Sequence, residues 1–199
     1  MNIPPTFKDV EIASERLAGY AIKTPVLESD KINDRLNCRV LIKAENLQRT
    51  GSFKFRGAFN MIASLKDDQK KRGIVAYSSG NHAQGVAAAA KILKIESTIV
   101  MPLDAPKIKI ENTIRDGANV IFYNRAESNR VKIAKKIVEE TGATLIPPFD
   151  APEIIAGQGT LGLEFYSQIN IKNTELDYLL APCSGGGLIA GNAIVFQEK

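Results

Sequence analysis

Lys54 is the residue of this chain that we expect to act as a nucleophile. It lies in Gly-Ser-Phe-Lys-Phe-Arg-Gly-Ala, residues 51–58, where Ser52 is a good N-cap and apolar residues then recur at helical spacing. Lys54 is therefore predicted in a first helical turn, where the positive field of free N–H groups favours the neutral amine. A neutral amine can attack a carbonyl carbon and form a Schiff base. The alternative is a solvated surface lysine, which is the usual state of this residue type.

Two loops could supply the ligands of a small anionic molecule. Residues 78–82, Ser-Ser-Gly-Asn-His, and residues 183–188, Cys-Ser-Gly-Gly-Gly-Leu, each lie between a predicted strand and a predicted helix. Open parallel sheets bind ligands at such loops. Successive glycines allow backbone N–H groups to converge on a phosphate, and the missing Gly-Lys-Ser/Thr argues against a magnesium-bound triphosphate. The alternative is a tight turn that needs glycine only for its conformation.

A third glycine-rich stretch fits a dinucleotide-binding pattern in the wrong context. Residues 157–162, Gly-Gln-Gly-Thr-Leu-Gly, match Gly-x-Gly-x-x-Gly, and Asp177 stands roughly where a ribose-binding acid is expected. The preceding strand should end by Ile146 and a helix should begin at Pro152, so the glycines fall inside that helix. We expect them to allow close helix packing and not to bind a dinucleotide.

The remaining polar candidates give weaker signals. His82 is the only histidine, so a catalytic triad or a histidine metal cluster is hard to build, and a packing or hydrogen-bonding role is at least as good an interpretation. Cys183 could be a thiol nucleophile, but a small buried residue is the better interpretation because no base is evident. Cys38 and Cys183 are the only cysteines and are far apart in the chain, which indicates neither a disulfide framework nor a metal site.

Composition and charge are those of an ordinary globular protein. The chain has 199 residues, of which 44% are hydrophobic and 24% charged, enough for one substantial core or two small ones. The formal net charge of +4 comes from scattered lysines and arginines, so no nucleic-acid partner is expected. No apolar run could span a bilayer, and the N-terminus lacks a signal-peptide pattern. We therefore expect a cytoplasmic protein without a membrane partner.

Predicted strands and helices alternate along most of the chain. Strands are predicted at 39–44, 74–77, 97–101, 119–123, 143–146 and 177–182, and helices at 7–19, 81–93, 106–115, 127–140, 152–169 and 186–197. Single helices between strands imply right-handed crossovers and a parallel sheet covered on both faces. The sequence therefore predicts an α/β fold of open, mainly parallel αβα layers, with a boundary at Pro147 and Pro148.

Four motifs together resemble the serine/threonine dehydratase and serine racemase family. These are residues 52–58, 78–82, 155–160 and 184–188, which follow the family's order and spacing. The family consists of pyridoxal-phosphate enzymes of the tryptophan synthase β-like fold, fold type II. The resemblance implies a small α/β domain, residues 73–146, and a large cofactor-binding domain, residues 1–68 and 148–199. The large domain would be incomplete, because family members continue further, and its uncovered edges predict poor solubility or dependence on a partner.

The resemblance also assigns roles to residues. Lys54 would hold pyridoxal 5'-phosphate as a Schiff base and then remove the Cα proton of the substrate. Ser79 matches the second acid/base of the racemases, and Ser78, Ser79 and His82 belong to the loop that receives the substrate carboxylate. The residues expected to contact the cofactor are Phe53 beside the ring, Asn81 at the phenolic oxygen, and Ser184, Gly185, Gly186, Gly187 and Leu188 at the phosphate.

The expected activity is dehydration of L-threonine or L-serine to 2-oxobutanoate or pyruvate and ammonia. Phe55 stands where cysteine synthase-like relatives usually carry an acid, which favours the deaminating and racemising branch. Racemisation of serine or another amino acid and dehydration of 3-hydroxyaspartate are close variants. The alternatives are an inactive fragment that at most binds cofactor, and a nucleotide- or sugar-phosphate-binding module without Schiff base chemistry. The expected partner is a small hydroxy-amino acid, and a homo-oligomer is expected if the native chain is longer.

Overall fold

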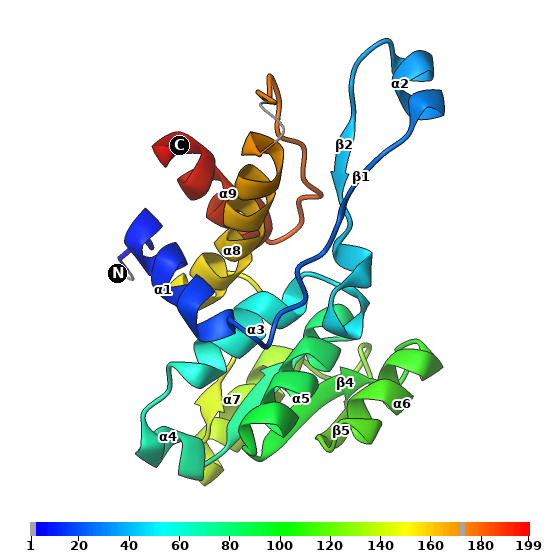
Figure 1. Cartoon of the computed structure of the whole chain (residues 1–199). Coiled ribbons are helices and arrows are strands. Elements are labelled where there is room, and N and C mark those ends of the chain that lie inside the picture. The colour runs from blue at the N-terminus through cyan, green and yellow to red at the C-terminus, as the bar shows by residue number, and fades with distance from the viewer. Residues whose placement is uncertain (1–2, 172–173) are drawn as a thin grey trace.

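The computed structural model describes residues 3–171 and 174–199 and shows a mixed α/β fold (Figure 1). The strands are β1 (Val26–Glu28), β2 (Leu41–Lys43), β3 (Ile74–Tyr77), β4 (Ser97–Pro102), β5 (Asn119–Tyr123) and β6 (Thr144–Leu145). The helices are α1 (Phe7–Leu17), α2 (Asp30–Leu36), α3 (Lys54–Ala63), α4 (Asp67–Lys71), α5 (Asn81–Leu93), α6 (Lys107–Arg115), α7 (Arg130–Thr141), α8 (Pro152–Asn170) and α9 (Gly187–Glu198), with two 3-10 turns, η1 (Glu45–Leu47) and η2 (Arg49–Gly51).

Four parallel strands form one sheet in the order β5-β4-β3-β6. Ile74 of β3 lies opposite Ser97 of β4 on one side and opposite Thr144 of β6 on the other. The chain therefore moves from β3 to β4 and β5, and then returns through α7 to the far side of β3. This reversal leaves a crevice at the carboxyl ends of β3 and β6, the usual ligand position in such sheets. The predicted parallel α/β sheet is confirmed.

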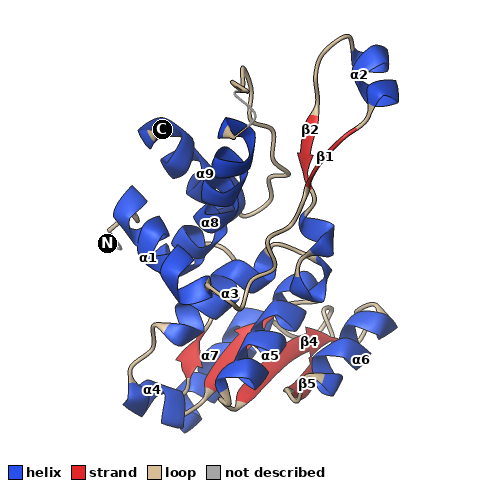
Figure 2. Ribbon diagram, viewed as in Figure 1, coloured by secondary structure: helices blue, strands red, loops and turns tan. Residues whose placement is uncertain are grey.

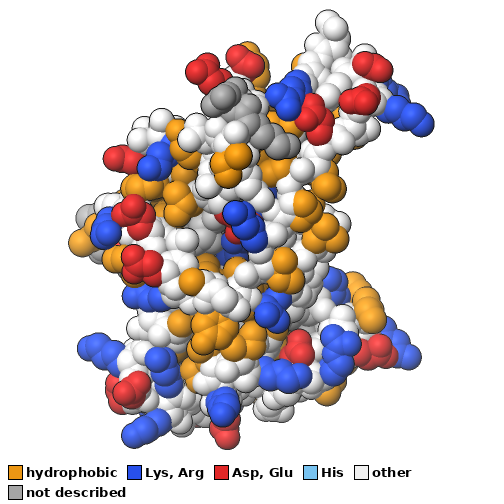
Figure 3. Space-filling model, viewed as in Figure 1, with side chains coloured by type: hydrophobic (Ala, Val, Ile, Leu, Met, Phe, Trp, Pro, Cys, Tyr) orange, Lys and Arg blue, Asp and Glu red, His pale blue; other side chains and the backbone are white. Residues whose placement is uncertain are grey.

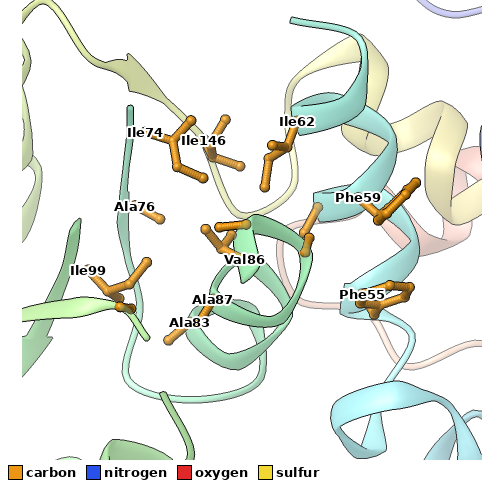
Figure 4. Packing of buried hydrophobic residues seen from close by; sticks show 14 of the residues in the cluster. Phe55, Phe59, Ile62, Ile74, Ala76, Ala83, Val86, Ala87, Ile99 and Ile146 are labelled. Carbon is orange, nitrogen blue, oxygen red and sulfur yellow. The ribbon is translucent and has the colours of Figure 1, made fainter. Parts of the chain in front are cut away.

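Alternate residues of the sheet pack against opposite helical layers, as the two-residue period of a strand requires. Ile74 of β3 belongs to the core that contains α5, whereas Val75 packs with Ala134 of α7. Figure 2 shows helices on both sides of the sheet. Figure 4 shows α5 lying between the sheet and α3, with Ile62 of α3 directed toward Val86 of α5. Phe55 and Phe59 of α3 belong to the same buried cluster. The start of α3 is thus positioned on the sheet through α5.

Three helices cross α8 at close range, and glycines allow the contacts. A Cβ on Gly157 would lie 2.6 Å from the Cα of Gly57 on α3, and a Cβ on Gly159 would lie 2.8 Å from the carbonyl oxygen of Gly191 on α9. Gly159 also faces Val10 of α1. The prediction that these glycines lie inside a helix and serve its packing is confirmed.

Strands β1 and β2, with α2 at their tip, project from the body as an antiparallel arm (Figure 1). Figure 3 shows charged side chains over the tip of this arm. At its base, buried Arg56 of α3 donates two hydrogen bonds to Glu45 and one to Glu164 of α8. Lys43 of β2 also pairs with Glu164. The arm is thereby joined to α3 and α8 by charges that are each paired.

The strand predicted over 177–182 is wrong. Residues 174–183 have no regular secondary structure, and Tyr178 and Leu180 are 86% and 92% exposed. A strand is stabilised by hydrogen bonds to a neighbouring strand, and no strand of the described residues is paired with residues 177–182. The strand predicted over 39–44 is shorter, Leu41–Lys43. Within the described ranges no helix is long and apolar enough to cross a bilayer.

We expect Gly157→Ala to lower the free energy of unfolding by about 1–3 kcal/mol, because the atoms nearest to the new Cβ are backbone atoms and the Asn60 Cβ of α3, and relieving the overlap would force the two helices apart. Denaturant unfolding followed by circular dichroism measures this change. Ser167→Ala, at an exposed position of the same helix, is the control and should change stability by less than about 0.5 kcal/mol. Equal stability of both variants would contradict the close-contact explanation.

Candidate active site

A cavity of about 390 Å³ lies at the carboxyl ends of β3 and β6, where the strand order reverses. Its walls come from the start of α3, the loop between β3 and α5, and the loop before α9. Every residue that the sequence analysis singled out for the cofactor or the substrate lines it: Phe53, Lys54, Ser78, Ser79, Asn81, His82, Ser184, Gly185, Gly186, Gly187 and Leu188. Three motifs that are far apart in the sequence therefore meet at one place.

Lys54 is the first residue of α3, one position nearer the helix start than the sequence indicated. Phe53 occupies the N-cap position and makes no side-chain capping bond. The prediction that Ser52 caps the helix is wrong: its hydroxyl is buried and has no hydrogen-bond partner in the part of the chain that the structure describes. Ser52 has an extended backbone and directly precedes the N-cap residue Phe53, so it stands one residue too early to cap the helix.

The amine of Lys54 is half-buried and faces the chain that leaves β6. Its Nζ donates a hydrogen bond of 2.6 Å to the carbonyl oxygen of Pro148 and lies 5.2 Å from the centre of the Phe53 ring. Burial lowers the pKa of Lys54 below its ordinary value, because the charged form loses hydration. The predicted direction is confirmed, but the cause is burial and not the field of the helix terminus.

Two hydrogen bonds fix the loop of residues 78–82 at the start of α5. The backbone N–H of Gly80 donates to the hydroxyl of Ser78 at 3.2 Å. Asn81 accepts a bond of 2.7 Å from Lys109 of α6 at Oδ1. Because lysine can only donate, this contact directs the amide NH₂ of Asn81 away from Lys109. Asn81 is left with donors for another partner.

His82 is buried, with 2% of its surface exposed. Its Nε2 lies 3.0 Å from the carbonyl oxygen of Ile146, while Nδ1 has no partner among the described residues. Burial lowers the pKa of His82 to about 4, and the charge of Lys54 adds to this effect. The ring is therefore neutral at physiological pH.

The glycine-rich loop wraps around Phe149. A Cβ on Gly185 would lie 2.1 Å from the ring of Phe149, and a Cβ on Gly187 would lie 2.4 Å from its carbonyl oxygen. Gly186 has φ +85°, a conformation that favours glycine. Helix α9 begins at Gly187, so its first N–H groups have no partner within the helix and can bind an anion. The glycines of this loop can therefore serve both the turn conformation and the binding of an anion.

Cys183 is exposed, which corrects the expectation of a small buried residue. It belongs to the irregular chain before α9, and no strand within residues 3–171 and 174–199 is paired with this stretch. Sequence reasoning also missed Tyr77, Arg130 and Phe149 as residues of the cavity. Arg130 opens α7, and its guanidinium lies 5.5 Å from the centre of the Tyr77 ring. No motif marked Arg130 or Phe149, because only the tertiary structure brings α7 and the chain after β6 to the cavity. Tyr77 directly precedes the loop of residues 78–82, and this adjacency is the signal that could have found it.

Comparison with known proteins decides the family. The sequence profile described as "Pyridoxal-phosphate dependent enzyme" matches residues 17–199. The chain belongs to this family. It is 47% identical over 196 residues to the L-threo-3-hydroxyaspartate ammonia-lyase of Saccharomyces cerevisiae, covering 98% of this chain and 59% of that protein. It is 41% identical over 197 residues to the catabolic L-threonine dehydratase of Escherichia coli, with 99% and 59% coverage.

Solved structures agree with this family. The fold superposes on maize serine racemase with a TM-score of 0.93 at 39% identity, covering 98% of this chain and 58% of that one. The chain thus spans about 59% of the length of the curated relatives it matches. The expected family and the fold type II architecture are confirmed, and the members of this family depend on pyridoxal 5'-phosphate.

The cavity fits the cofactor of this family. It offers a half-buried amine on Lys54, free amide donors on Asn81, and backbone N–H groups in the glycine-rich loop. A Cβ on Gly185 or Gly187 would overlap Phe149, so this loop needs glycine at both positions. An aldehyde, a phenolic oxygen and a phosphate match these three groups in chemistry. Over residues 3–171 and 174–199, no cluster of three histidine, cysteine or acidic side chains could hold a metal ion.

His82 makes stability depend on pH in a defined direction. Its pKa is about 4 in the folded chain against 6.5 for the ordinary group, so its contribution is complete above pH 6.5 and is lost as the pH falls toward 4. We expect the stability difference between the wild type and His82→Gln to shrink by about 1.4 kcal/mol per pH unit over this range. Urea unfolding at pH 7, 6 and 5 measures it. Acidic residues titrate in both proteins and cancel, so a pH-independent difference would contradict a buried neutral ring.

Proposed function

We propose that the chain carries the cofactor-binding and catalytic groups of a dehydratase (ammonia-lyase) that converts L-threonine or L-serine to 2-oxobutanoate or pyruvate and ammonia. One observation carries the proposal: Lys54, the loop of residues 78–82 and the loop of residues 184–188 line a single cavity. The activity named for the Escherichia coli relative supports the choice of reaction. Because the chain spans only part of its relatives, activity of this chain by itself belongs to the proposal.

Each wall of the cavity has its own task in this proposal. Phe53 packs beside the cofactor ring, the amide of Asn81 donates to the phenolic oxygen, and the backbone of residues 184–188 binds the phosphate. Pyridoxal phosphate, when bound, supplies a conjugated ring that delocalises negative charge at the substrate Cα. The chain itself has to orient the molecule and move protons.

Lys54 is the residue we assign to proton transfer. Its lowered pKa keeps a larger fraction of the amine neutral near pH 7, and a neutral Nζ can both attach the cofactor and take up the Cα proton. The carbonyl oxygen of Pro148 accepts a hydrogen bond from Nζ and so holds the amine in the cavity. Ser79 is the second acid/base candidate, which racemisation would require.

We assign the substrate carboxylate to the hydroxyls of Ser78 and Ser79 and to free N–H groups at the start of α5. The ring of His82 is turned to Ile146 and buried, so His82 contributes by fixing the loop. This differs from a direct contact between imidazole and substrate.

We also infer two domains, a small one of residues 73–146 and part of a larger one formed by residues 1–68 and 148–199. All four strands of the parallel sheet fall in the first range, and α1, α8 and α9 pack together in the second. The cytoplasmic location and a homo-oligomeric full-length protein remain predictions from the sequence.

The proposal is tested by adding pyridoxal phosphate to the chain and recording absorbance near the visible edge before and after L-serine or L-threonine. We expect a band that shifts with substrate, release of keto acid, and a borohydride-reduced label that peptide mapping places on Lys54. Lys54→Ala should abolish the label and lower the rate by at least about 10²-fold. Lys132→Ala, at an exposed position of α7, is the control and should change neither.

Two results would decide against the proposal. A label on Lys54 without substrate-dependent changes or keto acid would favour an inactive cofactor-binding fragment. Binding of a sugar phosphate or nucleotide with no label on Lys54 would favour a phosphate-binding module.

A second activity, dehydration of 3-hydroxyaspartate, is favoured by Arg130. Arg130 lines the cavity from an exposed position, and among the described residues it forms no ion pair. Its guanidinium lies over the Tyr77 ring. A cation without a carboxylate partner suits a substrate whose side chain carries a second carboxylate. The ammonia-lyase of Saccharomyces cerevisiae is named for such a substrate.

We expect Arg130→Gln to lower kcat/KM for L-threo-3-hydroxyaspartate by about 10- to 100-fold, the usual effect of losing a charged hydrogen bond. The value for L-serine should change by less than about threefold, because serine has no second carboxylate. Steady-state assays with both substrates measure the ratio. Parallel losses for the two substrates would show that Arg130 does not select the side chain.

A further inference from the structure

Lys54 and His82 are bound by two carbonyl groups of one short segment. The chain that leaves β6 offers the oxygen of Ile146 to Nε2 of His82 at 3.0 Å and the oxygen of Pro148 to Nζ of Lys54 at 2.6 Å. The two acceptors are two residues apart, and both side chains line the same cavity. The imidazole and the amine therefore lie at one wall of the cavity although they belong to different helices.

The bond to Ile146 fixes the protonation state of the imidazole. A carbonyl oxygen can only accept, so Nε2 must carry the hydrogen, and Nδ1 of the neutral ring is left with a lone pair. Nδ1 is buried and has no donor among the described residues. Buried acceptors without a donor are uncommon in folded proteins. We therefore looked for a donor that could reach Nδ1 of His82 when a side chain of the cavity changes its conformation.

Lys54 is the charged group that acts on this ring. Its positive charge lowers the pKa of His82. In this structure Nζ is hydrogen-bonded to Pro148, and it makes no hydrogen bond to Nδ1. The other ionisable groups that line the cavity are Tyr77 of β3, Arg130 of α7 and Cys183 before α9, and none of them contributes to the shift of His82. A protonated Nζ has three donors, of which Pro148 accepts one.

We propose that His82 is a positioning residue for Lys54, whose protonated Nζ donates a second hydrogen bond to the neutral Nδ1. The proton stays on Lys54, since the imidazole is too weak a base to take it, and no covalent bond to His82 forms or breaks. The half-buried amine thereby gains a neutral acceptor for its charged form. This inference rests on the proposed role of Lys54 as cofactor-binding amine and proton carrier, and it adds the group that stabilises the proton on Nζ.

Nitrogen NMR of the single histidine gives a direct test that needs no cofactor. With ¹⁵N-histidine in the cofactor-free chain, we expect one imidazole in the Nε2–H form from pH 6 to 10. The Nδ1 signal should move as Lys54 titrates, and the same signal in Lys54→Met should not move. A proton on Nδ1, or an identical pH response in both proteins, would overturn the proposal.

The pKa of Lys54 gives a second test that a merely structural role of His82 would not pass. The rate at which an amine-directed acylating reagent labels the Lys54 peptide is measured by mass spectrometry against pH. Loss of the acceptor in His82→Phe should destabilise the ammonium and lower the labelling midpoint by about one pH unit. His82→Gln, which can donate to Ile146 and accept from Lys54, should restore the midpoint to within about 0.3 units.

Gln84→Leu is the matched control for these variants. Gln84 lies on the same helix, is 3% exposed, and also has a buried side-chain oxygen without a described partner, but it does not line the cavity. The labelling midpoint of Lys54 in this variant should equal that of the wild type.

An unchanged midpoint in His82→Phe, or the same shift in Gln84→Leu, would refute the role of Nδ1. If His82→Phe does not fold, the NMR comparison decides. Both readouts are independent of enzymatic turnover, so they can fail while the dehydratase assay succeeds, and the reverse.

Discussion

The short segment that leaves β6 is the contact on which the rest of the site depends. Its backbone binds the imidazole of His82 through Ile146 and the amine of Lys54 through Pro148, and Phe149 fills the space that glycines leave in the loop before α9. The three walls of the cavity are therefore placed relative to one another by a few consecutive residues. Two of these contacts use carbonyl oxygens, which no side-chain substitution removes.

Burial has different consequences for Lys54 and Arg56, two cations in the first turn of α3. Among the described residues no acid pairs with Lys54 of α3 or with the neighbouring His82 of α5, so loss of hydration lowers the pKa of each and favours the neutral forms. Two residues further along, Arg56 is 1% exposed but stays charged, because Glu45 and Glu164 neutralise it through several hydrogen bonds. One helix thus presents a reactive amine on one side and a fully paired structural cation on another.

The glycines of this chain serve two different purposes. Those of α8 allow α3, α1 and α9 to approach its backbone, which fixes the helix that carries Lys54 against the helix that follows the glycine-rich loop. Those before α9 leave room for Phe149 and a free helix N-terminus in the cavity. This arrangement suits the cofactor of the family, because pyridoxal phosphate carries an aldehyde and a phosphate on different sides of one small ring. Lys54 is placed for the aldehyde and the loop before α9 for the phosphate.

Local patterns in the sequence predicted the alternation of helices and strands over residues 74–169, the helical context of residues 157–162, and the family through four motifs in order. These features depend on the periodicity and type of residues that are close in the sequence, so they can be recognised without knowing which distant segments pack together. Only the tertiary structure decided that Ser52 does not cap α3, that residues 177–182 form no strand without a neighbour, and that burial lowers the pKa of Lys54. It also decided that Arg130 and Phe149 belong to the cavity, because pairing, desolvation and contact depend on which distant segments pack together.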